Sequence, residues 1–265
     1  MVIDCHTHVT GSHGARRKPE DLIASMDEAG IEYSLLIADF HSHTNRGVTN
    51  EEVIEIVAKH FPRIQAIGNV DYATLDSAQE AKLKHYIEKR VIVGLKCYLG
   101  YEHFYPADEK LFELYAFCSE RNAPVMFHTG ITESSHRTVL KYAKPLGVDE
   151  VASLFPDLKI VIAHMGNPWI ADCAAVVAKN KNVYVDCSGY FKEYSPIEEV
   201  EADRFREQMR EFRIFVGDYK KLLFGTDWPI YSQGEYLSVV QTLPMTDEER
   251  ELVFRGNAET LFGIP

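Results

Sequence analysis

The sequence is poor in the features that mark several classes of protein. Its five cysteines are scattered along 265 residues and never form a CxxC pair. Neither a disulfide framework nor a zinc finger is expected, and a reducing cytoplasm suits such a chain. The net charge is −12 and no run of lysine or arginine interrupts it. Nucleic acid is therefore not an expected partner.

Long apolar runs are also lacking. None approaches the roughly 20 residues that a membrane span requires, and the N-terminal MVIDCHTH has no basic flank followed by an apolar stretch. We expect neither a membrane helix nor a signal peptide. Internal repeats, low-complexity tracts and linkers are absent as well, which predicts a single domain over residues 1–265. The sequence leaves open whether copies of the chain form a homo-oligomer.

What the sequence does contain is a regular alternation of short apolar runs with longer amphipathic ones. The short runs are rich in Val, Ile, Leu and aromatic residues, as in strands that are covered on both faces. The predicted strands span residues 1–5, 33–39, 64–70, 91–99, 123–128, 158–164, 182–188 and 221–227.

Signals for helix starts and stops lie between these runs. Some are side chains that cap the first turn, one is a proline placed at the first helical position, and one is a terminating glycine. They are the capping boxes Thr49/Glu52 and Thr246/Glu249, the pair Ser195-Pro196, and Gly30.

Eight strands, each followed by a helical segment, predict parallel βαβ units. Eight is the number that closes a (β/α)8 barrel, and about 250 residues is its usual size. The alternative is an open doubly wound sheet with two domains, but no GxGxxG or GxxxxGK[ST] phosphate loop follows any predicted strand. The predicted fold class is therefore α/β, a (β/α)8 TIM barrel.

Imidazoles and carboxylates gather where the predicted strands end. These ends meet on one rim of a barrel, and active sites of barrel enzymes lie there. A lone histidine after an apolar run is more often structural than a ligand, but several on one rim weaken that interpretation. Imidazole and carboxylate ligands without thiolates suit zinc, or a harder ion such as manganese or iron. The residues are His6, His8, Asp39, Lys96, His128, His164, Asp186 and Asp227.

Barrel closure predicts which of these side chains meet. The eighth strand lies beside the first, so Asp227 is expected next to His6 and His8. His128 is expected to reach the same point from across the bore. Three imidazoles and one carboxylate with room for water form a catalytic metal site. Asp4, in the same Asp-x-His-x-His string, is expected to share their face and accept hydrogen bonds behind them.

A second Asp-x-His-x-His string, DFHSH, occupies residues 39–43. The strand before it is expected to finish near Asp39, and the residues that follow the string are turn-like. His41 and His43 would then lie in the loop above the rim. We interpret them as pocket or lid residues, with plain surface histidines as the alternative.

Five segments in order also resemble the amidohydrolase superfamily, in particular its amidohydrolase-related branch, which includes aminocarboxymuconate-semialdehyde decarboxylase. The resemblance covers the whole chain and implies a distorted (β/α)8 barrel with one or two divalent ions at its mouth. The segments are DCHTH, VMFHTG, IVIAHMG, LLFGTDWP and GNAETLFGI.

The resemblance also assigns roles by motif. It implies that His6, His8 and His128 are metal ligands. Asp227 would be a ligand, or the acid and base that acts on the attacking water. His164 would either bind a second metal or hydrogen-bond the water and the substrate, and the family leaves this choice open.

Three residues are candidates for substrate binding. Lys96 lies near the place where some superfamily members carry a carboxylated lysine that bridges two metals. Unmodified, it would be a cation suited to a substrate carboxylate or phosphate, or one that neutralises acidic groups in the bore. Tyr98 points the same way and is a candidate hydrogen-bond donor to substrate. Arg137 follows the fifth strand in a loop where substrate contacts are common.

The expected activity is metal-dependent hydrolysis of a small, anionic ester, lactone or amide. Asp227 would take the proton from the attacking water and deliver it to the leaving group, and His164 would steady the oxyanion. One alternative is a non-oxidative decarboxylase that uses the same site. Another is a metal-binding barrel without activity, which the presence of both His164 and Asp227 disfavours. Zinc is the metal we expect first.

Overall fold

The computed structural model describes residues 1–11, 16–39, 47–133 and 137–264. Eight strands form one sheet in sequence order, and every pairing from the first to the eighth strand is parallel. The predicted strands are confirmed; seven are shorter than predicted, and the first lies two residues further along the chain. They are β1 (Ile3–Thr7), β2 (Tyr33–Ile37), β3 (Ile64–Asn69), β4 (Gly94–Cys97), β5 (Val125–Phe127), β6 (Ile160–Ile162), β7 (Val183–Asp186) and β8 (Leu222–Leu223).

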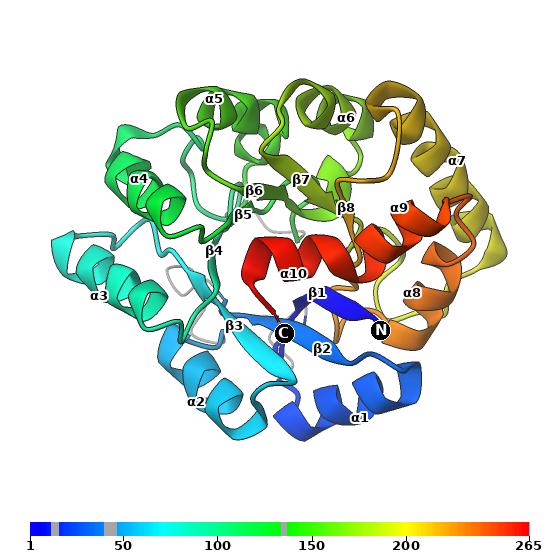
Figure 1. The fold of residues 1–265 in the computed structure, drawn as a ribbon, viewed down its shortest axis with the longest axis horizontal. Coiled ribbons are helices and arrows are strands. Elements are labelled where there is room, and N and C mark those ends of the chain that lie inside the picture. The colour runs from blue at the N-terminus through cyan, green and yellow to red at the C-terminus, as the bar shows by residue number, and fades with distance from the viewer. Residues whose placement is uncertain (12–15, 40–46, 134–136, 265) are drawn as a thin grey trace.

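Backbone hydrogen bonds join the end of the sheet to its beginning. The amide of Cys5 donates to the carbonyl of Phe224 (2.9 Å), and the amide of His8 donates to the carbonyl of Trp228 (2.7 Å). The sheet thereby closes into the (β/α)8 barrel that the sequence predicts, and Figure 1 shows its ring of surrounding helices. Closure places the residues after β8 directly against β1.

Helices follow the strands as expected. Both predicted threonine capping boxes are present: Glu52 N donates to Thr49 Oγ1 (3.1 Å) and Glu249 N to Thr246 Oγ1 (3.2 Å). The α-helices are α1 (Pro19–Ala29), α2 (Asn50–His60), α3 (Ser77–Glu88), α4 (Phe112–Glu120), α5 (Leu146–Leu154), α6 (Ile170–Lys179), α7 (Glu199–Val216), α8 (Gln233–Val240), α9 (Asp247–Glu251) and α10 (Asn257–Phe262).

One helix start differs from the prediction. The sequence places Pro196 at the first helical position, whereas α7 begins at Glu199. Glu198 precedes it and donates its backbone amide to the carboxylate of Glu201 (3.2 Å), three residues later. This reciprocal cap satisfies the first turn without the Ser-Pro pair, which lies in the preceding loop. The glycine stop is confirmed, since Gly30 ends α1 at a φ of 70°.

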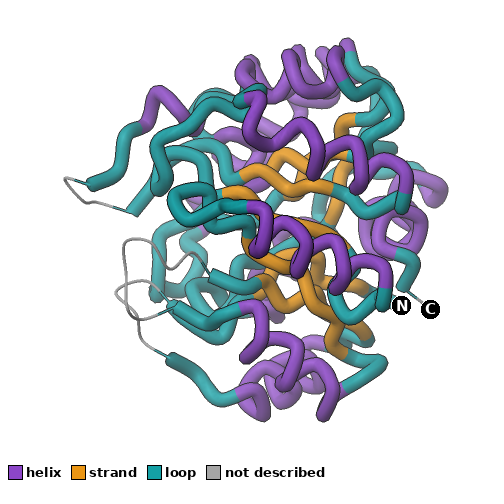
Figure 2. Tube along the Cα trace, turned by 90° about the vertical axis from the view of Figure 1, so that its left-hand side faces the viewer, coloured by secondary structure: helices purple, strands orange, loops and turns teal. Residues whose placement is uncertain are grey.

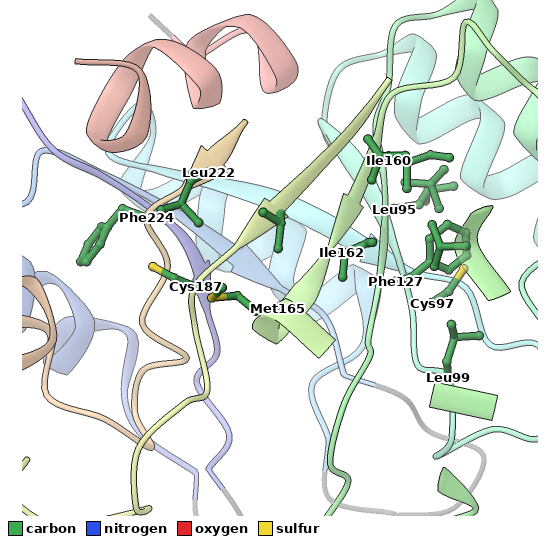
Figure 3. Close-up of a cluster of buried hydrophobic side chains, with 14 of the residues drawn as sticks. Leu95, Cys97, Leu99, Phe127, Ile160, Ile162, Met165, Cys187, Leu222 and Phe224 are labelled. Atoms are coloured by element: carbon green, nitrogen blue, oxygen red, sulfur yellow. The ribbon is translucent and has the colours of Figure 1, made fainter. Parts of the chain in front are cut away.

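The strands separate two apolar layers. Side chains such as Leu95 and Cys97 point outward and pack under the helices in the larger core, part of which Figure 3 shows. The alternate residues of each strand point into the bore instead, where Met126 of β5 and Val161 of β6 belong to a smaller apolar cluster. This alternation directs Lys96, between Leu95 and Cys97, into the bore. Figure 2 shows the strands enclosed by helices.

α10 closes the end of the barrel at which the strands begin, and Figure 1 shows it across the centre of that end. Leu261 and Phe262 pack with Ile3 in the cluster that fills the bore. Asn257 Nδ2 donates to the carbonyl of Leu222 (2.8 Å) and ties the helix to β8. The open end is therefore the opposite one, where the strands finish. Across the described residues, no helix has both the length and the apolar character needed to cross a membrane.

Candidate active site at the mouth of the barrel

Asp227, His6 and His8 converge as barrel closure predicts. Asp227 Oδ1 lies 3.7 Å from His6 Nε2 and 3.4 Å from His8 Nε2. The backbone fixes this arrangement, because Asp227 N donates to the carbonyl of His6 (2.8 Å). Asp227 has a φ of 68°, a left-handed conformation that aspartate and asparagine tolerate better than most residues. The carboxylate is thus turned toward the two imidazoles.

Asp4 does not join the imidazoles, and this corrects the expectation drawn from the Asp-x-His-x-His string. Its oxygens accept from the hydroxyl of Thr226 (2.6 Å), the amide of Gln233 (2.8 Å) and the backbone N of His6 (3.1 Å). Ile3 and Cys5 point into the bore, so Asp4 between them points outward. A shift of register after Asp4 in the β1–β2 pairing brings His6 to the bore side, next to Lys96. Asp4 joins β1 to the segment after β8.

Asp39 and Asp227 flank the ring of His8. Asp39 Oδ1 lies 3.1 Å from His8 Nδ1, as an ion-pair contact rather than a well-aligned hydrogen bond. Burial lowers the pKa of His8, but the two carboxylates outweigh it and the net shift is upward. The pKa of His6 moves the other way, well below its ordinary value, because of burial and the nearby Lys96 charge. His6 is therefore a neutral imidazole that can ligate a metal.

Asp186, the last residue of β7, and Ser188, just after it, hold His6 and His164 from behind. Asp186 Oδ2 lies 2.9 Å from His6 Nδ1, so the Nε2 of His6 is left to face Asp227. Ser188 Oγ lies 3.1 Å from His6 Nδ1 and 2.9 Å from His164 Nδ1. The sequence pattern places Asp186 among the residues of the rim and misses Ser188. The signal was its place two residues after Asp186, on the same side of a strand end.

His164 reaches the site through an unusual backbone. His164 and Met165 follow β6 with φ values of 61° and 53°, in the left-handed region. The ring of His164 lies 4.6 Å from that of His6 and 4.8 Å from that of His128, between centroids. Gly189 packs against Nδ1 so closely that a Cβ there would collide with the ring. Burial holds the pKa of His164 well below its ordinary value.

His128 lies at the same mouth, with its imidazole directed at other partners. Its Nε2 lies 3.2 Å from the carbonyl of Ile131, and its ring packs edge-on against Tyr101 at 4.9 Å. Burial, with a contribution from Lys96, lowers its pKa to about 3. Its ligand atoms are not among those that cluster with Asp227 in the described residues. His128 would have to turn away from Ile131 to bind a shared ion through Nε2.

Lys96 is fully buried in the bore, and its Nζ lies 3.4 Å from His6 Nε2. Burial lowers its pKa to about 8, while Asp186 and Asp227 act in the opposite direction. The amine is a cation at neutral pH and stands beside the nitrogen that His6 turns toward Asp227. Among the described residues, the carboxylates at the site pair with His6 and His8, and none lies within ion-pair distance of Lys96 Nζ.

The two remaining substrate-binding candidates have protein contacts. The hydroxyl of Tyr98 donates to the carbonyl of Ala38 (2.9 Å), so its proton is already engaged. Arg137 is exposed, and its carbonyl accepts from His103 Nε2 (2.8 Å). Neither contact brings the side chain into the group around Asp227. His41 and His43 lie outside the described residues.

Within the part of the chain that the structure describes, two groups of side chains bring potential metal ligands together: His6, His8 and Asp227, and His6, His164 and Asp186. The first group fits an ion well. Tetrahedral bonds of about 2.1 Å separate neighbouring ligand atoms by about 3.4 Å, and the distances around Asp227 Oδ1 are 3.4 and 3.7 Å. The second group is held by direct hydrogen bonds. The donor set of the first suits a divalent metal.

A model of the family described as Amidohydrolase matches residues 3–264. The chain belongs to the amidohydrolase family. Membership and the His/Asp group together support an enzyme with a divalent metal.

Comparison with curated proteins gives an amidohydrolase relative with a named activity. A gamma-resorcylate decarboxylase from a Polaromonas species is 27% identical over 133 residues, which are 42% of this chain and 36% of that protein. The match thus spans about a third of that relative's length.

Solved structures share the fold over nearly the whole chain. An uncharacterised TIM-barrel protein from Bordetella bronchiseptica is 23% identical, with a TM-score of 0.74 over 99% of this chain and 98% of that one. A probable 2-pyrone-4,6-dicarboxylic acid hydrolase from Acinetobacter baumannii is 18% identical, with a TM-score of 0.73 over 99% of both chains. A dihydroxybenzoic acid decarboxylase from a Polaromonas species, with bound manganese and 2-nitroresorcinol, is 15% identical, with a TM-score of 0.72 over 99% and 96%.

Proposed function

We propose that this amidohydrolase-family chain is a metal-dependent, non-oxidative decarboxylase of small, planar, hydroxylated ring acids. The observation that supports it most is a buried cation beside the candidate metal ligands: Lys96 Nζ lies 3.4 Å from His6 Nε2, at the group formed with Asp227. Such a cation suits a substrate carboxylate. The names of the decarboxylases that the chain resembles point to hydroxybenzoic acids of this kind.

His6, His8 and Asp227 would hold the ion, with His128 as a further ligand. We propose zinc on ligand chemistry, with manganese or iron as alternatives, since a relative of known structure contains manganese. A divalent ion at this site supplies a Lewis acid for substrate oxygens. Five free, buried cysteines support the proposal of a reducing, cytoplasmic location.

Lys96 would bind and orient the acid. Its ammonium group, buried in the bore beside His6, offers up to three hydrogen bonds to a carboxylate. Arg137, exposed near the mouth, would attract the anion before it binds. The hydroxyl of Tyr98 would have to leave the carbonyl of Ala38 before it could donate to a substrate. We therefore propose that the main role of Tyr98 is to shape the pocket.

Asp227 would move the proton. Burial raises its pKa to about 6, with His8 and Lys96 acting in the opposite direction. A carboxyl group with this pKa is a usable acid near neutral pH. As the bond between the ring carbon and the carboxylate breaks, carbon dioxide leaves and the electron pair of that bond stays on the ring carbon. Asp227 delivers a proton to that carbon and is reprotonated from solvent. His164 would hydrogen-bond the substrate on the same side.

Hydrolysis of a lactone or ester is the second candidate, and the same Asp227 favours it. A carboxylate whose pKa is about 6 also accepts protons. Asp227 would take a proton from a water molecule, whose oxygen bonds to the carbonyl carbon, and would return it to the leaving oxygen as the ester bond breaks. The likeness to a probable pyrone dicarboxylic acid hydrolase gives a substrate class to test.

The deciding experiment is a substrate panel on metal-analysed protein. Dihydroxybenzoates and carboxylated hydroxybenzoates are assayed for carbon dioxide release, and pyrones and acidic lactones for ring opening. We expect carbon dioxide release with the metal present. Ring opening of a pyrone or lactone with no release of carbon dioxide would establish hydrolysis instead. Activity in protein shown to contain no metal would contradict both proposed reactions.

Lys96→Met tests the anion site, with Lys181→Met, an exposed lysine before β7, as the matched control. We expect a rise in KM of about tenfold or more for a carboxylated substrate from the loss of a charged hydrogen bond. The control should behave as wild type. An unchanged KM in the Lys96 variant would remove the proposed role.

A further inference from the structure

Asp186 is a buried acceptor that serves four donors. Its Oδ1 accepts from the backbone amides of His164 (3.0 Å) and Ser188 (3.0 Å), and it lies 2.5 Å from Ser188 Oγ. Its Oδ2 lies 2.9 Å from His6 Nδ1. Asp186 and Ser188 are both fully buried. Because an ionised carboxylate only accepts hydrogen bonds, every atom that contacts these oxygens has to bring a proton.

This requirement fixes the hydroxyl proton of Ser188. A serine has one such proton, and two oxygens 2.5 Å apart repel unless it lies between them. The hydroxyl therefore donates to Asp186. What Ser188 offers His164 is then a lone pair, at 2.9 Å from His164 Nδ1. His164 Nδ1 has to carry the proton of that contact, since two lone pairs facing each other would make no bond.

We propose that Ser188 is a positioning residue that holds the proton of His164 on Nδ1, so that Nε2 meets the substrate as a proton acceptor. In a neutral imidazole only one nitrogen carries a proton. The described residues supply no hydrogen bond to His164 Nε2 among the contacts of the site, and the ring faces those of His6 and His128.

This assignment changes the role that the sequence suggested for His164. An unprotonated Nε2 does not donate to an oxyanion. It accepts from an O–H group, which a hydroxylated ring acid or a water molecule presents. The assignment of a substrate partner rests on the proposed function, whereas the position of the proton rests on the network alone. Asp186 also bonds to His6 Nδ1. In the group formed by His6, His164 and Asp186, hydrogen bonds therefore take the place of a metal ion.

Histidine side-chain ¹⁵N NMR tests the proposal directly, because the two neutral tautomers give different ring nitrogen shifts and coupling patterns. The full-length protein is labelled at its imidazoles and measured both metal-free and loaded with zinc, and His164→Asn identifies the signal. We expect His164 to be protonated at Nδ1 in wild type. Ser188→Ala should move a large share of the population to the Nε2–H form, and Ser188→Thr should restore the wild-type spectrum by restoring the hydroxyl.

Ser34→Ala is the matched control, because Ser34 is another buried serine of the barrel, bonded to Thr7 Oγ1 at 3.0 Å and away from His164. Its His164 signal should match wild type. An Nε2–H tautomer in wild type, or an unchanged tautomer in Ser188→Ala, would overturn the proposal. If Ser188→Ala does not fold, the wild-type spectrum and Ser188→Cys decide, since a thiol is a weak acceptor.

Kinetics separate this inference from the proposed function. With an active substrate, Ser188→Ala should lower kcat about 10- to 100-fold, as loss of supporting contacts behind a site commonly does. Its zinc content should stay at the wild-type level because Asp186 still holds His6. Protein that binds no metal but shows the Nδ1–H tautomer would contradict the proposed function and leave the role of Ser188 standing.

Discussion

The two ends of the barrel show opposite uses of similar positions. At the end where the strands begin, Leu261 and Phe262 of α10 pack with Ile3, and the bore is filled with apolar side chains. At the end where the strands finish, His6, His164 and Asp186 occupy the same bore and are also buried. Burial of apolar groups stabilises the fold, whereas burial lowers the pKa values of His6 and His164 and keeps these imidazoles neutral for chemistry. Stability and function should therefore be separable by mutation.

The largest expected effect is loss of the metal. His6→Ala combined with His8→Ala removes two of three side chains that converge at the mouth. Metal analysis should find little or no ion in this variant, while its thermal unfolding stays cooperative. His41→Ala with His43→Ala is the comparison from the second histidine string, and its metal content should persist. Loss of metal from the 41/43 variant but not from the 6/8 variant would reverse the assignment.

Asp227→Asn should have the next largest effect. The amide keeps the shape and tolerates the left-handed backbone at this position, but it can neither donate nor accept the catalytic proton. Steady-state turnover should fall at least about 10²- to 10⁴-fold. Circular dichroism should show an unchanged fold. Turnover at the wild-type rate would remove Asp227 from the reaction.

Phe262→Ala probes the opposite end of the comparison. Phe262 is buried in the cluster that closes the barrel, and its truncation leaves a cavity. The free energy of unfolding, measured with denaturant, should fall by about 3–5 kcal/mol. The metal content and kcat of the folded fraction should stay at wild-type values. A parallel loss of metal would mean that the two ends are not independent.

The smallest effect is expected at a helix cap on the surface of the barrel. Thr246 accepts from Glu249 N at 3.2 Å, and Thr246→Ala removes this bond from the start of α9. Unfolding should become easier by about 1 kcal/mol, with no change in activity. Thr246→Ser keeps the hydroxyl and should restore stability. A loss of stability as large as that of Phe262→Ala would show that Thr246 does more than cap the first turn of α9.

The sequence by itself determined the order of the strands and which polar residues lie near their ends. Buried parallel strands need apolar residues on both faces, so the runs that became β1 to β8 are visible without a structure. Because the ends of all strands in a closed barrel share one rim, the meeting of His6 and His8 with Asp227 also followed from the sequence. The threonine caps are readable for the same local reason, since their partners lie three residues away.

Only the tertiary structure decided which contacts those residues make once they meet. The register shift in β1 separates Asp4, which bonds to Thr226 and Gln233, from the imidazoles with which the sequence pattern places it. Ser188 is an ordinary residue in the sequence, and its role arises where β7 approaches β1 and β6. Hydrogen bonds between residues distant in sequence depend on angles and separations of a few ångströms. Local patterns do not encode such distances, because they are set by how the whole barrel packs.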